Sequence, residues 1–122
     1  MRELAPGVRQ LRGFPPEAIN VYLLGDVLVD AGTRFARRRI MRQLRDSRLT
    51  AHALTHAHPD HQGASHAVCE AFGIPLWCGE GDVEAMETPG GIARSQPPGP
   101  LGRTRSGRDN RFHYVNHPLS AR

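Results

Sequence analysis

Four side chains of types that commonly bind metals fall within six consecutive residues. The segment 55–63 reads THAHPDHQG and brings together three imidazoles and a carboxylate, those of His56, His58, Asp60 and His61. Successive side chains of an extended chain alternate between two faces, so His56 and His58 face the same way. Two neutral imidazoles on one side form half of a tetrahedral zinc site. The spacing therefore favours a metal site over the competing interpretation, a solvated polar loop.

The second half of this segment predicts a second pair of ligands. Pro59 cannot continue a central strand and favours a turn, so Asp60 and His61 can project beside the first pair. Carboxylate and imidazole groups bind zinc, iron or manganese. Two metals a few ångström apart lower the pKa of a shared water and hold the reacting group. We therefore expect two divalent metal ions, with zinc as the default and iron or manganese as alternatives.

Apolar segments of alternating strand and helix character surround these residues. Two β-rich runs flank Gly25-Asp26, a turn dipeptide, and predict a hairpin. The next segment has apolar residues at helical spacing, with arginines on its other face. Gly73 is typical of the glycine that ends a helix. The expected elements are strands at 7–11, 19–24, 27–30, 49–55 and 74–78, helices at 34–46, 64–72 and 81–87, and a loop at 56–62.

The order of these elements indicates an α/β fold. We expect a mixed sheet with the helices 34–46 and 64–72 packed on one of its faces. The four metal-binding side chains should converge at the C-terminal end of the strand 49–55, since ligand loops of open α/β sheets lie at that edge.

Length and composition indicate one domain without a membrane segment. The chain has 122 residues, of which 39% are hydrophobic and 23% charged. No apolar run reaches the roughly 18 residues that span a bilayer, and the N-terminus lacks the apolar stretch of a signal peptide. The spacing of Cys69 and Cys78 matches no disulfide framework, zinc motif or thioredoxin motif. We therefore expect no membrane association and a cytoplasmic location.

The basic charge is concentrated at the C-terminal end of the chain. Residues 1–87 carry ten arginines and eleven acidic residues, whereas residues 88–122 carry six arginines and one aspartate. The segment 88–122 is also rich in Pro and Gly, and it cannot bury enough apolar surface to offset its ordering entropy. We predict a poorly ordered tail there. A nucleic-acid-binding arm is the weaker alternative, because the tail has few aromatic residues and no known nucleic-acid module.

Residues 56–61 resemble the HxHxDH signature of the metallo-β-lactamase superfamily. The segments NVYLL at 20–24, LVDAG at 28–32 and LTHAHPDHQG at 54–63 are similar to that family's opening strands and metal loop, in the same order. The resemblance covers roughly residues 4–87 and is greatest to the hydroxyacylglutathione-hydrolase-like metallo-hydrolases. It implies an αββα sandwich, of which residues 1–87 would form the N-terminal half-domain.

The resemblance also implies a role for individual residues. His56 and His58 would bind one metal, Asp60 and His61 would bind the other, and Asp60 would also be the catalytic residue. A bridging hydroxide would attack a thioester, ester, amide or phosphoester bond of a small-molecule substrate. Asp30 would orient the metal loop through a hydrogen bond to a ligand histidine.

The chain departs from this family in its length. Family members are longer, and their remaining ligands come from a second half. His113 and His117 lack family-like surroundings, so no role is transferred to them. His52 is expected to be a packing or surface residue, and His66 a residue of a helix face. A truncated or frameshifted gene product is one hypothesis that explains this departure.

Two main hypotheses for the function follow from this interpretation. The first is a metal-dependent hydrolase, and the second is an inactive metal-binding fragment or association module. A half-sandwich would expose an apolar sheet face, which favours self-association. Binding of nucleic acid through the basic tail is a third and weaker hypothesis.

Overall fold

The computed structural model describes residues 1–83, 86 and 112–114. Within them one sheet contains seven strands, in the order in which they occur along the chain. The strands are β1 (Arg2–Ala5), β2 (Val8–Gln10), β3 (Tyr22–Leu24), β4 (Val27–Val29), β5 (Ala51–Ala53), β6 (Leu76–Gly79) and β7 (Phe112–Tyr114). The α-helices are α1 (Arg37–Leu44), α2 (Pro59–Gln62) and α3 (Ser65–Phe72), and the 3₁₀ turns are η1 (Arg34–Ala36) and η2 (Glu80–Asp82).

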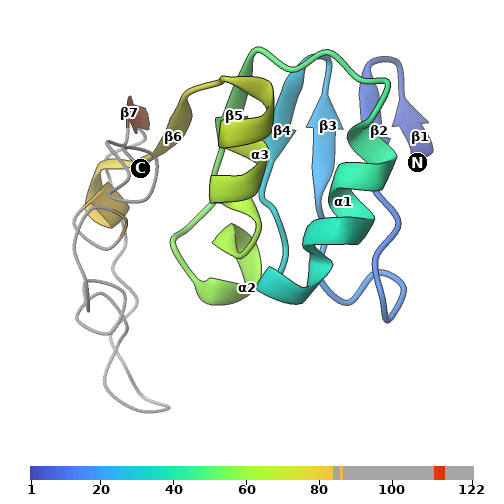
Figure 1. Ribbon diagram of the computed structural model, residues 1–122, viewed down its shortest axis with the longest axis horizontal. Coiled ribbons are helices and arrows are strands. Elements are labelled where there is room, and N and C mark those ends of the chain that lie inside the picture. Colours follow the sequence, from blue (N-terminus) through green and yellow to red (C-terminus); the bar gives the residue numbers. More distant parts are fainter. Residues whose placement is uncertain (84–85, 87–111, 115–122) are drawn as a thin grey trace.

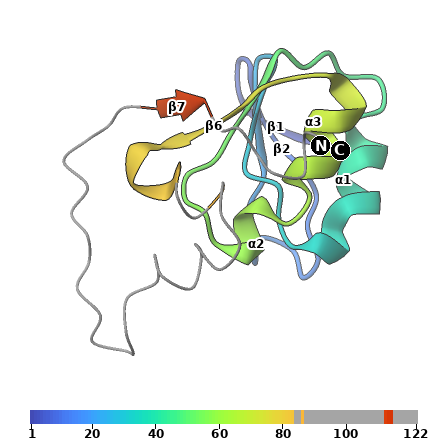
Figure 2. The same cartoon turned by 60° about the vertical axis from the view of Figure 1, so that its left-hand side comes forward.

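The two main helices cover one face of the sheet, as the sequence predicted. Strand β4 pairs with β5, and β5 with β6, in parallel, whereas the other neighbouring pairs are antiparallel. The connections through α1 and α3 step across the sheet in the same direction. Because such connections are almost always right-handed, their helices lie on the same face (Figures 1 and 2). The expected mixed α/β sheet is confirmed.

The core lies between this sheet and the two helices. A row of register partners crosses four strands, and its side chains face α1 and α3: Leu23, Leu28, His52 and Leu76. Leu23 and Leu28 are fully buried and pack in one cluster with Ile40, Leu44 and Val68 of the helices. Burying a large aliphatic side chain stabilises the fold by about 1.5–3 kcal/mol. This row therefore fixes how the helices sit on the sheet.

His52 is the polar member of that row and is fully buried. Its Nδ1 lies 3.0 Å from the carbonyl oxygen of Leu28, and its Nε2 lies 2.8 Å from Oγ of Ser65. A carbonyl only accepts, so Nδ1 donates and Ser65 donates to Nε2. The neutral ring thus joins β4, β5 and α3. Of the two roles left open by the sequence, His52 has the packing role.

Several element boundaries differ from the sequence-based expectation. The helix expected at 34–46 begins as a 3₁₀ turn and its α-helical part ends at Leu44. Thr33 precedes it, without a capping hydrogen bond from its side chain. The segment expected as a loop at 56–62 contains the short helix α2, because Pro59 occupies the first helical turn and favours helix initiation there. Gly73 ends α3 in the left-handed conformation, as predicted.

Two strands were not predicted. β1 is exposed along its length, so no alternation of apolar residues marks it. β7 lies within the segment expected to be a poorly ordered tail and pairs with the edge strand β6. The rest of 88–122, including His117, lies outside the described residues. Of the helix expected at 81–87, the structure describes η2 and the helical residues Val83 and Met86.

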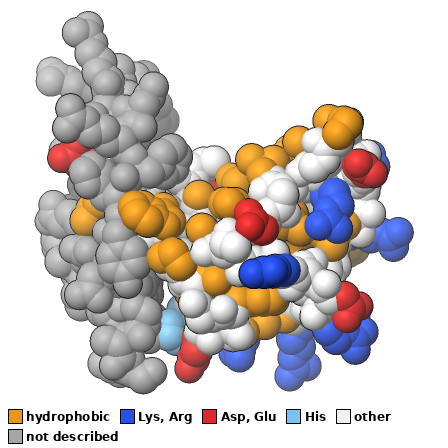
Figure 3. All heavy atoms as spheres, turned by 90° about the horizontal axis from the view of Figure 1, so that it is seen from above, with side chains coloured by type: hydrophobic (Ala, Val, Ile, Leu, Met, Phe, Trp, Pro, Cys, Tyr) orange, Lys and Arg blue, Asp and Glu red, His pale blue; other side chains and the backbone are white. Residues whose placement is uncertain are grey.

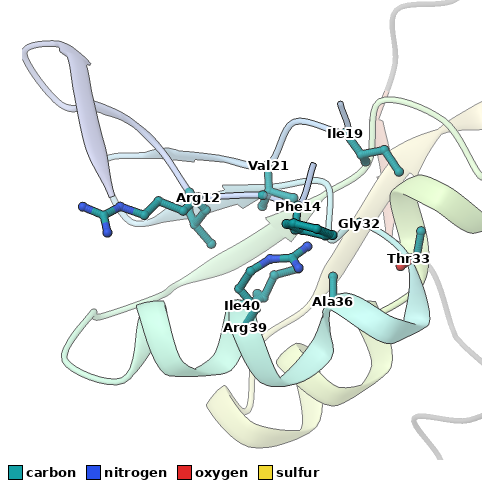
Figure 4. Close-up of a pocket in the computed structure, with 11 residues that line it drawn as sticks. Arg12, Phe14, Ile19, Val21, Gly32, Thr33, Ala36, Arg39 and Ile40 are labelled. Atoms are coloured by element: carbon teal, nitrogen blue, oxygen red, sulfur yellow. The ribbon is translucent and has the colours of Figure 1, made fainter. Parts of the chain in front are cut away.

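The loop before β3 packs against the first main helix. Gln43 of α1 accepts from the backbone N–H of Arg12 at 2.6 Å and donates to its carbonyl at 2.9 Å. Next to these two hydrogen bonds, Phe14 and Arg39 face each other across a small cavity of about 40 Å³ (Figure 4). The N-terminal hairpin is thereby attached to the helix layer.

The face of the sheet opposite the helices is apolar. The register row Tyr22, Val29, Ala53 and Trp77 alternates with the core row and is half-buried or exposed. The two main helices, α1 and α3, lie on the other side of the sheet (Figure 2). Self-association through it stays a prediction.

The charged side chains seen from above are mixed. Figure 3 shows acidic groups between the arginines, with no continuous basic stripe on the described part of that surface. No helix in the described part of the chain has the length and apolar character that a membrane span requires.

Gly63 allows the short helix α2 to pack closely against η1. The N–H of Gly63 donates to the carbonyl of Gly32 at 2.8 Å. A Cβ atom added at Gly63 would collide with the backbone of Thr33 and Arg34. Because backbone atoms cannot rotate out of the way, this junction requires the absence of a side chain.

We expect Gly63→Ala to lower the free energy of unfolding by about 1–3 kcal/mol or more, as overpacking does. Gly79→Ala is the matched control, because a Cβ there meets no atom within 4 Å. Urea unfolding of both variants checks this expectation. Equal stabilities of the two variants would contradict the packing at Gly63.

Burial lowers the pKa of His52 below its ordinary value of 6.5, against the raising effects of the Leu28 carbonyl and of Asp30. The unfolded chain therefore protonates this ring at a higher pH than the folded protein does. The contribution of His52 to stability is complete above pH 6.5 and decreases as the pH falls below it. The free energy of unfolding then decreases by at most about 1.4 kcal/mol per pH unit.

Long-range ¹H–¹⁵N NMR of the ring and urea unfolding, both between about pH 7.5 and pH 5.5, test this expectation around the ordinary histidine pKa. At every pH in this range, the His52 ring should be neutral in a larger fraction of the folded protein than of the unfolded chain. A ring that gains its second proton at or above its ordinary pKa in the folded protein would contradict the burial argument.

Candidate metal centre

The candidate site lies where two parallel strands end. Asp30 directly follows β4, and Thr55 and His56 follow β5 after one buried leucine. Because β4 and β5 are parallel neighbours, their C-terminal ends meet at the same edge of the sheet. The helix α2 lies at this edge (Figure 1). The topology thus brings the segment 55–61 beside Asp30.

The four residues that the sequence singled out lie together. One ligand atom from each of His56, His58 and Asp60 falls within 4.8 Å of the others. The ring of His56 has its centroid 4.4 Å from that of His58 and 4.0 Å from that of His61. The Nε2 atom of His61 lies 3.6 Å from Oδ2 of Asp60. That these residues bind metal stays a prediction.

The short helix α2 determines how the four side chains converge. His58 is extended and precedes the helix, and its carbonyl accepts from the backbone N–H groups of His61 and Gln62 at 2.9 and 3.0 Å. Asp60 and His61 are therefore placed by a helical turn rather than by the open loop that the sequence predicted. The backbone N–H of Ala31 also donates to the His61 carbonyl at 2.6 Å.

The buried carboxylate of Asp30 connects Thr55, at the end of β5, to His61 of α2. Its Oδ1 accepts from the backbone N–H of Thr55 at 2.8 Å, and its Oδ2 accepts from the Thr55 hydroxyl, also at 2.8 Å. The same Oδ2 lies 2.9 Å from Nδ1 of His61. Asp30 has a positive φ of 63°, a conformation uncommon for residues with a side chain. The three hydrogen bonds to its carboxylate offset the conformational free energy that the positive φ of Asp30 costs.

The hydrogen bonds determine the tautomers of two histidines. A carboxylate only accepts, so His61 donates through Nδ1, and the neutral form of this ring has its lone pair on Nε2. The Thr55 hydroxyl gives its single proton to Asp30, so it accepts from Nδ1 of His56, which lies 2.9 Å away. His56 then also has an unprotonated Nε2. Fixing a ligand histidine through its second nitrogen is the usual arrangement in metal sites.

Electrostatics favour the neutral form of His56. Burial lowers its pKa most, and the neighbouring His61 and His58 lower it further, against the raising effects of Asp30 and Asp60. Only a neutral imidazole can bind a metal ion. The environment of His56 is therefore suited to a ligand.

Two further histidines, His52 and His66, lie apart from this cluster. His52 is in the core, and Nε2 of His66 on α3 lies 3.3 Å from Oε2 of Glu70. Thr55 is a residue of the site that was not among the candidates from the sequence. A threonine directly before the motif is the signal for it, but its two bonds depend on Asp30, which is distant along the chain.

The chain matches a known family over most of its length. Residues 14–116 match the family model described as the metallo-beta-lactamase superfamily. This range includes Asp30 and all four clustered residues. No curated protein matches the chain significantly.

Solved metallo-beta-lactamases have the same fold. The Cronobacter sakazakii metallo-beta-lactamase with the HARLDQ motif has a TM-score of 0.62 at 22% identity, over 70% of this chain and 36% of its own. BJP-1, a subclass B3 enzyme of Bradyrhizobium japonicum, has a TM-score of 0.61 at 23% identity, over 73% and 37%. BLEG-1, a B3 metallo-beta-lactamase, has a TM-score of 0.57 at 27% identity, over 90% and 51%.

The chain thus spans between 36% and 51% of the length of these structures. The family match and the shared fold confirm the resemblance that the motif and its flanking strands indicated. The chain belongs to the metallo-beta-lactamase superfamily.

Proposed function

We propose that this chain carries the metal-binding half of a metal-dependent hydrolase. The observation that supports this most directly is the cluster of His56, His58 and Asp60, whose ligand atoms lie within 4.8 Å of one another. His61 adjoins the cluster and is fixed by Asp30. An imidazole-rich set with a carboxylate fits zinc, and it also fits iron or manganese.

The residues of the cluster have distinct parts in this proposal. His56 and His61 present unprotonated Nε2 atoms, and His58 and Asp60 complete the set of donors. A divalent ion bound there would lower the pKa of a bound water and polarise the bond to be cleaved. The side chain of Asp60 is 50% exposed, so its carboxylate can orient that water and accept its proton.

The substrate proposed is a small molecule with a thioester, ester or amide bond. Attack by water on its carbonyl carbon breaks the bond to sulfur, oxygen or nitrogen, and the leaving group takes up a proton. Two metal ions, one bound by His56 and His58 and one by Asp60 and His61, remain the preferred arrangement. Each ion then has two ligands from the described residues.

An inactive metal-binding fragment is the second candidate function. A catalytic zinc ion normally has three protein ligands and a water. In the proposed arrangement each ion has two protein ligands, one fewer than a catalytic zinc ion normally has. We therefore expect weak metal binding and little turnover from such a fragment. The complete proteins of the family are longer than this chain, so their activity is not transferred to it.

A metal titration of the full chain tests both candidates. We expect chelator-treated protein to bind zinc, and His58→Ala with Asp60→Ala to weaken binding by more than about tenfold, because both donors are strong ligands. His66→Ala is the control, since His66 lies outside the cluster. Isothermal titration calorimetry and elemental analysis give the affinity and the stoichiometry.

Turnover then separates the two candidate functions. Zinc-dependent hydrolysis of a chromogenic thioester, abolished by the double substitution, would support the hydrolase. Zinc binding without turnover would support the inactive fragment. Zinc binding that the double substitution leaves unchanged would contradict both.

A second prediction concerns the buried carboxylate. Asp30→Asn keeps a side chain that tolerates positive φ but cannot accept from both Thr55 and His61 as a carboxylate does. We expect zinc affinity to fall by about 10–100-fold, as is typical when the partner of a ligand histidine is removed. Asp26→Asn, at the exposed hairpin turn, is the matched control. Equal affinities of the two variants would show that Asp30 does not position the ligands.

A further inference from the structure

A hollow of about 400 Å³ adjoins the candidate metal centre. Residues 33–35 form one of its walls, and residues of α2 with Gly63 form the other. Asp60 belongs to this lining and also to the metal-binding cluster. A molecule bound in the hollow therefore lies beside Asp60.

The two walls are held in a fixed relation. The N–H of Gly63 donates to the carbonyl of Gly32, and the backbone at Gly63 lies against that of Thr33 and Arg34. The hollow thus exists without a ligand and does not depend on a movement of α2. Preformed sites of this kind bind without the cost of ordering their walls.

One wall combines an aromatic ring with a cation. Phe35 is 80% exposed, and the guanidinium carbon of Arg34 lies 4.8 Å from the centroid of its ring. Within the described residues, no carboxylate forms an ion pair with Arg34. A planar guanidinium is the side chain best suited to a carboxylate, which it can bind through two hydrogen bonds.

The chemistry of the lining selects one class of ligand. The exposed phenyl ring and Pro59 favour an aromatic or bulky apolar group. Arg34 favours an anionic group on the ligand and disfavours a cationic one. Asp60, which also lines the hollow, disfavours a second anionic group unless a metal ion neutralises its charge.

We propose that this hollow is a substrate subsite for an aryl carboxylate, with Arg34 binding the carboxylate and Phe35 stacking on the aromatic group. This inference rests on the proposed hydrolase function, because it places the bond to be cleaved beside Asp60. The substrate class is then a thioester, ester or amide with an aromatic carboxylic acid in one of its two parts.

Binding of 2-naphthoate to the chelator-treated full chain tests this proposal without any metal. We expect NMR shifts at residues 33–35 and 59–63, and at least about tenfold weaker binding of the uncharged 2-naphthamide, as the loss of a charged hydrogen bond implies. Arg34→Ala should weaken naphthoate to the same degree. Arg42→Ala, at an exposed arginine of α1, is the control and should leave it unchanged. Phe35→Ala should weaken both probes.

Equal affinities for naphthoate and naphthamide would overturn the proposed subsite. Equal effects of Arg34→Ala and Arg42→Ala on the affinity for naphthoate would overturn it too. The result does not depend on the metal titration. If zinc binds at the histidine cluster and Arg34→Ala leaves the affinity for naphthoate unchanged, only the proposed subsite is contradicted. If naphthoate requires Arg34 and zinc does not bind, only the proposed hydrolase function fails.

Discussion

The carboxylate of Asp30 is the interaction on which the candidate site depends. It is buried at the end of β4 and accepts from the backbone and hydroxyl of Thr55 and from Nδ1 of His61. A buried carboxylate without partners would cost several kcal/mol, so these bonds are required by the fold as well as by the site. Through them one residue determines the tautomer of His61 directly and that of His56 through Thr55.

The sheet topology explains why Asp30 can reach both residues. Two crossovers in the same direction place the ends of β4 and β5 side by side and put both helices on one face. The connection after β4 then turns into η1, and the one after β5 turns into α2. The absence of a side chain at Gly63 allows η1 and α2 to come into contact, and residues of the two turns form the two walls of the hollow beside Asp60.

Local patterns in the sequence predicted most of the strands, both main helices and which residues lie together at the candidate metal centre. Alternating apolar runs around Gly25-Asp26 and the HAHPDH motif are signals within a few residues of one another. The features that were missed depend on distant parts of the chain. β7 exists by pairing with β6, the bonds of Thr55 require Asp30, and the hollow requires η1 and α2 to meet. The turn dipeptide Pro6-Gly7 is a local signal for β1 that remained unused.

We infer that His56 and His61 present unprotonated Nε2 atoms to the proposed metal ions. Long-range ¹H–¹⁵N NMR of the chelator-treated full chain, repeated after addition of zinc, measures the tautomers of both rings. We expect the Nδ1–H tautomer for both rings before zinc is added, and a selective shift of their Nε2 resonances afterwards. Nε2–H tautomers in the metal-free protein, or zinc-induced shifts confined to His66, would contradict it.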